Sequence, residues 1–226
     1  VGSTRKKIKK KNKVMKPLQK KIEKMNDKTI EQNKTFAKMG KMQKRVAIAH
    51  DVIASIKANK FKATPGTYCE LKLNKKHKFE GAGDVELQSL MESGVVEKCN
   101  VCAIGGIFAS KVAIGNKFKV SVEEDYWNDN KLGIETDVDD DELLIENLDG
   151  IYTERELRLI EFAFEGEDIR GEFYDEEIDI DALNSYKKVH KKADERLIAI
   201  MQNIIKNEGK FIPELLKKTA TSKKKK

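Results

Sequence analysis

The stretch from Val101 to Val112 constrains the fold most, because it is apolar on every side when it is drawn as a helix. Only Ser110 and Lys111 interrupt it with polar side chains. A helix without a polar face belongs in the interior of a domain. The sequence therefore predicts a buried central helix over residues 101–113, entered through a turn at Cys99–Cys102.

One side of this predicted helix is lined by small residues. At helical spacing they are Cys102, Gly105 or Gly106, Ala109 and Ala113. A strip of small residues lets a neighbouring backbone approach closely, which offsets the roughly 1 kcal/mol that a glycine costs inside a helix. We therefore expect a large side chain at Gly105 to overpack the core.

The rest of the chain mixes helical and strand patterns. Apolar stripes and capping residues predict helices over 43–57, 84–91, 140–148, 154–165 and 183–206. Alternation of apolar and polar residues predicts two strands, 67–73 and 118–122. The expected fold class is α+β and mostly α-helical. It is a single domain around the buried helix 101–113, with one or two short β-strand pairs and basic extensions at both ends.

Composition divides the chain into three parts. Residues 1–42 are predicted to form a basic arm that is disordered to helical, 43–213 a globular domain, and 214–226 a lysine-rich tail. Solvated lysines add little to a fold, so a chain of residues 44–212 is expected to keep the melting temperature of the whole chain.

Charge is strongly segregated along the sequence. The formal net charge of the 226 residues is +7. Residues 1–45 carry 17 Lys and Arg against 3 Asp and Glu, and residues 206–226 carry 8 against 2. The stretch between them therefore has a balance of −13. Polyanions are attracted to the two ends of such a chain and repelled by its middle.

The cationic ends favour nucleic acid as a partner. Lysines greatly outnumber arginines in the arm and aromatic residues are nearly absent there, which indicates salt-sensitive phosphate contacts without base readout. The candidate nucleic-acid-binding residues are Lys6, Lys7, Lys9, Lys10, Lys11, Lys13, Lys223, Lys224, Lys225 and Lys226. No apolar run reaches the roughly 18–20 residues that span a bilayer, and no apolar signal region follows the N-terminal lysines. We therefore expect no membrane partner and a cytoplasmic location.

Three cysteines are the other chemical feature of the sequence. Cys99 and Cys102 form one Cys-x-x-Cys pair, and Cys69 with His77 or His50 would complete a zinc site of three thiolates and one imidazole. A single such pair is a weak signal, and buried, reduced structural thiols are the favoured interpretation, with no cofactor. Cys102 at a helix N-terminus, with a histidine as base, is the alternative of a thiol-dependent enzyme.

Three stretches of the body carry a resemblance: Arg45–Ala49 with Asp51-Val52, Cys99–Gly106, and Ile200–Ile205. They are similar to segments of a family of tailed-phage and phage-bearing bacterial proteins without a settled activity. The resemblance covers roughly residues 44–213 and implies a phage setting, in the host cytoplasm or the virion. It transfers no catalytic residues.

The favoured hypothesis is a non-enzymatic phage accessory or virion-associated protein that holds nucleic acid non-specifically through its lysine-rich ends. The first alternative is a thiol- or zinc-dependent enzyme centred on Cys99 and Cys102. The second is an inhibitor of a host protein that acts through the acidic surface of the body.

Overall fold

The fold was analysed in a computed structural model. The residues that it describes are 34–73, 83–86, 88, 91, 94, 96–115, 119–122, 131–133, 140–166 and 178–217. Helices α2 and α4 to α8 lie wholly within these ranges, together with four strands of one sheet and two of another. The expected fold class, mostly α-helical α+β, is confirmed.

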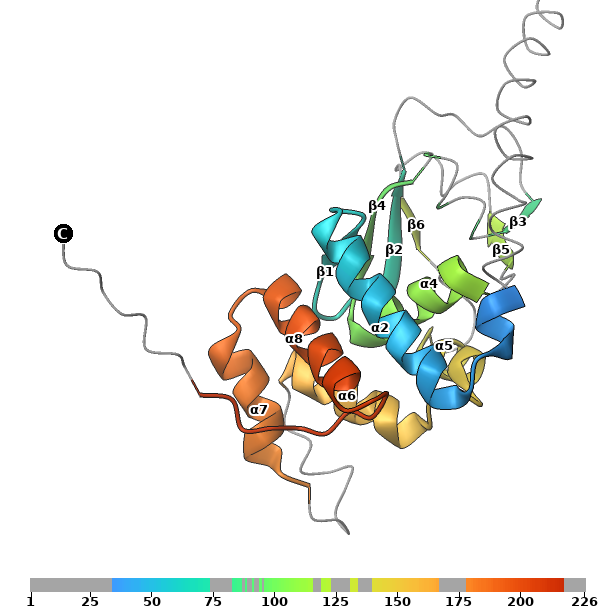
Figure 1. Ribbon diagram of the computed structural model, residues 1–226. Helices are drawn as coiled ribbons and strands as arrows, with labels where there is room; N and C mark the ends of the chain where they lie inside the picture. The colour runs from blue at the N-terminus through green and yellow to red at the C-terminus, as the bar shows by residue number, and fades with distance from the viewer. Residues whose placement is uncertain are drawn as a thin grey trace, which may run out of the picture.

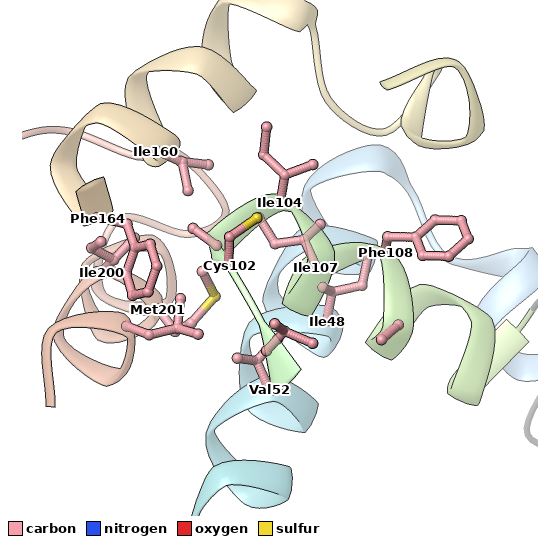
Figure 2. Close-up of a cluster of buried hydrophobic side chains, with 14 of the residues drawn as sticks. Ile48, Val52, Cys102, Ile104, Ile107, Phe108, Ile160, Phe164, Ile200 and Met201 are labelled. Atoms are coloured by element: carbon pink, nitrogen blue, oxygen red, sulfur yellow. The ribbon is translucent and has the colours of Figure 1, made fainter. Parts of the chain in front are cut away.

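Helix α4 (Ala103–Gly115) lies at the centre of the molecule. All of its residues from Ala103 to Ser110 are buried. Figure 2 shows its apolar side chains meeting Ile48 and Val52 of α2 (Lys41–Lys57), Ile160 of α6 (Glu154–Glu165) and Met201 of α8 (Ala193–Lys206). The predicted central helix is confirmed, but it begins two residues later than expected because Val101 still belongs to a strand.

Ser110 and Lys111, the two polar residues of this segment, have different surroundings. The Ser110 side chain is fully buried against α2, next to Asp51. The Lys111 ammonium donates to the carbonyl oxygen of Asn147 near the end of α5 (Asp140–Leu148). A cation at a helix C-terminus interacts favourably with the helix dipole, so Lys111 joins α4 to α5 without leaving its charge in the core.

The main sheet has four short strands in the order β1 (Phe61–Ala63), β4 (Val96–Val101), β2 (Cys69–Leu73) and β6 (Lys131–Gly133). β1 and β4 are parallel, and the β4–β2 and β2–β6 pairs are antiparallel. Figure 1 shows α2 crossing in front of this sheet. Along β1, β4 and β2 as far as Lys72, apolar residues alternate toward the helices, so one face of these strands is buried and the other is polar, as in many antiparallel sheets.

A second, two-stranded sheet pairs β3 (Gly83–Glu86) with β5 (Lys119–Val122). The strand expected over 118–122 is confirmed by β5, and the strand expected over 67–73 by β2. The helix expected over 84–91 is wrong only at its start: Asp84 pairs with Ser121 in the ladder, whereas Gln88 and Met91 are helical. Capping preference alone did not reveal this pairing, since the partner strand lies more than thirty residues further along the chain.

The single long helix expected over 183–206 is two helices, α7 (Ile180–Val189) and α8. Between them, His190 and Lys192 have extended backbone angles. The lysine-rich turn offers no apolar side chains to bury, and Asp194 and Glu195 favour a new helix N-terminus there. By contrast, the capping box of α6 is present as predicted, with Thr153 and Glu156 bonded to each other's backbone amides.

The folded body extends beyond both expected domain boundaries. Phe36, ahead of α2, is buried and packs against Gly115 at the end of α4. After α8 and a turn at 207–209, the chain runs without helix or strand to residue 217 and is held by Asn203 and Ser185. Figure 1 shows these two ends of the described chain on opposite sides of the molecule.

No helix in the described ranges combines the length and the apolar character needed to cross a membrane.

Candidate functional site

The ten lysines predicted to bind nucleic acid lie outside the described residues, at 6–13 and 223–226. His77, the candidate histidine ligand, also lies outside them. The three cysteines are all among the described residues.

Cys69 and Cys99 are brought together by the register of the central strands. Cys69 of β2 pairs with Val101 of β4, and Leu71 pairs with Cys99, so the two cysteines are diagonal neighbours on the buried face. Their sulfur atoms lie 3.4 Å apart, far longer than the roughly 2.05 Å of a disulfide bond, and both thiols are free. The contact with Cys69, followed by burial, raises the pKa of Cys99 well above its usual value. This pair forms a buried dithiol in the core.

Cys102 has a different role from the pair. It lies between β4 and α4, and its sulfur accepts a hydrogen bond from the amide of Gly105 at 3.3 Å. This is the position at which Ser, Thr, Asp or Asn usually caps a helix. Burial raises the pKa of the Cys102 thiol well above its usual value. A thiol in that state is a poor nucleophile at neutral pH, which disfavours the enzyme hypothesis.

The zinc hypothesis stays a prediction, because its candidate histidine ligand His77 lies outside the described residues. Among the residues that the structure describes, no group of three His, Cys, Asp or Glu side chains is arranged to hold a metal ion. Of the other histidines, His50 is exposed on α2 and His190 lies in the turn between α7 and α8.

A small pocket of about 270 Å³ opens beside Cys102. Its charged side chains come from α6. There the Arg158 guanidinium forms ion pairs with Glu154, with 3.8 Å between Nε and Oε1, and with Glu161, with 3.5 Å between Nη1 and Oε2. The floor is formed by the loop at Thr67 and Tyr68, which contacts the start of α4. One arginine, Arg158, and two glutamates, Glu161 and Glu165, line the pocket, and we assign no chemistry to it.

A larger pocket of about 490 Å³ lies between the end of α2 and the start of β4. Asp51, Ser55, Lys60 and Cys99 are among the residues that line it. The Oδ2 atom of Asp51 is buried and has no hydrogen-bond partner among the described residues. Burial raises the pKa of Asp51, while the neighbouring Ser110 hydroxyl and Lys60 ammonium partly offset the effect.

Sequence reasoning did not single out Asp51 as a site residue. The available signal was an acidic residue beside the apolar stripe of α2, with a serine in the otherwise apolar central helix. A carboxyl group in this setting is a hydrogen-bond acceptor for a ligand in the pocket, but nothing else in the pocket defines which ligand.

Comparison of the chain with protein-family models, with curated proteins and with solved structures found no match. The resemblance to a phage family therefore stays a prediction, and charge, burial and strand register carry the functional inference.

Proposed function

We propose that this protein binds nucleic acid without sequence preference, through lysine–phosphate contacts made by its two cationic ends. The observation that carries the proposal is the separation of charge. Residues 1–45 and 206–226 contain 25 of the 45 basic residues, whereas the stretch between them has a balance of −13. The proposed setting is a phage accessory or virion-associated role, in the host cytoplasm or in the virion.

Two features of the body support a role for the ends rather than for an enzymatic centre. The three thiols are buried, and the pKa values of Cys99 and Cys102 are raised well above the usual value, which argues against a thiolate nucleophile at neutral pH. The described chain also ends on opposite sides of the molecule (Figure 1), so the arm and the tail begin far apart. Two separated cationic segments suit attachment to an extended polyanion.

The test is a fluorescence-anisotropy titration of the full chain with labelled duplex and single-stranded nucleic acid at several salt concentrations. Logarithmic affinity is expected to fall linearly with logarithmic salt, with a slope of about 0.9 per phosphate contact on duplex and about 0.7 on single strands. Replacing the four tail lysines, Lys223–Lys226, by Gln lowers this slope, and so does replacing the six arm lysines.

A matched control removes four lysines from the α7–α8 end of the body: Lys187→Gln, Lys188→Gln, Lys191→Gln and Lys192→Gln. This variant has the same net charge as the tail variant and is expected to bind like the parent chain. Equal weakening by the control and by the tail variant would show that only net charge matters. Absence of binding, or binding without a salt slope, would overturn the proposal and favour the inhibitor with an acidic surface.

A further inference from the structure

We propose that the folded body carries a second phosphate-binding surface for the same nucleic acid, on the outer face of the four-stranded sheet. It is formed by Lys62, Lys72 and Lys98, which we call the sheet lysine face. The inference rests on the proposed function and deepens it. It adds a basic surface on the body, which the net negative charge of the body does not indicate.

Strand register aligns these lysines across the sheet. Lys72 of β2 is the direct partner of Lys98 of β4, and on its other side Lys72 pairs with Lys131 of β6. Adjacent strands lie about 4.8 Å apart, so lysine positions follow one another across three strands at that spacing. Lys62 of β1 pairs with Asn100, two residues along β4 from Lys98 and on the same face.

These side chains are directed away from the core. Lys62 and Lys72 are exposed and Lys98 is half-buried, whereas the alternate residues Phe61, Leu71 and Cys99 are buried. Successive side chains of a strand point to opposite faces of the sheet, so the alternation of the sequence places these lysines together on the outer face.

Within the described part of the chain, no carboxylate forms an ion pair with any member of the sheet lysine face. Lys98 donates to Asn59 Oδ1 at 2.9 Å, a neutral partner. The acidic residues of β1, β2 and β4 are Glu70, which accepts from Asn100 at 2.8 Å, and Glu97, which lies where the β2–β4 register shifts.

The lysines at the other end of the molecule differ. They form ion pairs between the lysine Nζ atom and a carboxylate oxygen. The distance is 3.1 Å for Lys192 and Glu195, 2.7 Å for Lys206 and Glu214, and 4.0 Å for Lys188 and Asp181. Surface lysines at that end are therefore paired with acidic side chains, whereas Lys62, Lys72 and Lys98 on the sheet are not paired with any acidic side chain that the structure describes. The contrast separates the sheet lysine face from an ordinary salt-bridged surface.

Like charges directly opposite each other destabilise a strand pair. An external polyanion removes that repulsion, and a phosphate backbone supplies regularly spaced negative charges for lysine point charges to contact. The outward residues of β1, β2 and β4 include no aromatic side chain on which a base would stack. The sheet lysine face is therefore expected to contact phosphates and to be indifferent to sequence.

The experiment uses the full chain and the same anisotropy titration. The triple variant Lys62→Gln, Lys72→Gln and Lys98→Gln is compared with Lys188→Gln, Lys191→Gln and Lys192→Gln, which removes three charges elsewhere. The sheet variant is expected to lower the salt slope on duplex by roughly 2–3 and to bind more weakly than the control. A charge-retaining variant with Arg at the three sheet positions is expected to restore binding, which separates charge loss from misfolding.

The outcomes distinguish this inference from the proposed function. If the chain binds and the tail variant is impaired, but the sheet variant behaves like its control, the sheet lysine face is overturned and the proposed function stands. If no version of the chain binds nucleic acid, both fail. If the sheet variant loses binding to polyglutamate but not to nucleic acid, the face belongs to an acidic polypeptide and the inference is overturned.

Discussion

At the residue scale, Gly105 and Gly106 of α4 differ in the space available for a side chain. A Cβ atom added at Gly105 would lie 1.4 Å from the Tyr68 carbonyl oxygen, a backbone atom that cannot move aside. A Cβ added at Gly106 would meet only ordinary contacts, the nearest 3.5 Å away on Val101. The close approach predicted for the small-residue strip is therefore present, and it is specific to Gly105.

This difference predicts opposite effects of two alanine substitutions. Gly105→Ala is expected to destabilise the fold by roughly 3 kcal/mol or more, because α4 must separate from the Thr67–Tyr68 loop. Gly106→Ala is expected to be neutral or to stabilise by up to about 1 kcal/mol through helix propensity. Urea unfolding of both variants checks this, and equal free energies of unfolding would contradict it.

Arg45 is a buried charged residue with several partners. Its guanidinium forms a two-point contact with the Glu156 carboxylate, donates to the carbonyls of Ile151 and Gly209, and lies over the Tyr152 ring with 4.7 Å between Cζ and the centroid. It thereby joins α2 to the start of α6 and the end of α8. Burial alone raises the pKa of Glu156, but the hydrogen bonds from Arg45 and Thr153 outweigh it and leave that pKa below its usual value.

The lowered pKa makes this contact pH-dependent. The folded state holds the Glu156 proton less tightly than the unfolded state, so the stabilisation is present above the ordinary carboxyl pKa of 4.5 and is lost as pH falls through the lowered value. Glu156→Gln is expected to cost about 2–4 kcal/mol at pH 7, since it leaves the buried Arg45 charge without its counterion. It should also remove this part of the pH dependence.

Glu154→Gln is the matched control, because Glu154 lies in the same helical turn with an exposed side chain. Its free energy of unfolding is expected to stay within about 0.5 kcal/mol of the parent. Unfolding curves between pH 3 and pH 7 measure both variants. A Glu156→Gln variant that keeps the acid-induced loss of the parent would refute this account.

At the element scale, the segment after α8 is fixed by side chains rather than by a strand partner. The Asn203 amide donates to the carbonyl of Ile212 at 2.7 Å and accepts from its N–H at 2.9 Å, which imitates a backbone pair. The Ser185 hydroxyl accepts from the Leu216 amide at 2.9 Å. Two buried polar residues on α8 and α7 thus explain how the segment stays on the body.

Asn203→Ala is therefore expected to release this segment. The loss should be about 1–3 kcal/mol, and amide hydrogen exchange at Ile212 should become much faster. Gln202→Ala, at an exposed neighbouring position of the same helix, is the control and should change neither quantity. Unchanged protection at Ile212 in the Asn203 variant would show that apolar contacts, not the amide, hold the segment.

The elements also show where sequence reasoning succeeds. Local signals predicted α4 from its uniform apolarity, and α6 from its Thr153–Glu156 capping box and terminal Gly166. Pairing between distant strands was not predictable, because β3 finds β5, and Cys69 meets Cys99, only through register over thirty or more residues. Asn203 was missed for a different reason: its partner, the backbone of Ile212, is near in sequence but leaves no side-chain pattern.

At the scale of the whole molecule, the boundary between body and extensions matters for both stability and binding. Phe36 precedes the expected domain start, yet its ring packs so closely on Gly115 that an added Cβ there would lie 2.2 Å from it. At the other end, Leu216 packs against the core. The cationic extensions therefore begin outside residues 34–217 rather than outside 44–212.

This boundary predicts different stabilities for two shortened chains. A chain of residues 34–217 is expected to unfold at the temperature of the full chain, because it keeps every described contact. A chain of residues 44–212 is expected to lose at least about 3 kcal/mol, since truncating one buried Phe alone costs about 3–5 kcal/mol. Phe36→Ala in the full chain separates this packing loss from the loss of charge, and its melting temperature should fall as well. Equal melting temperatures for the 44–212 chain and the full chain would place Phe36 and the segment after α8 outside the cooperative fold.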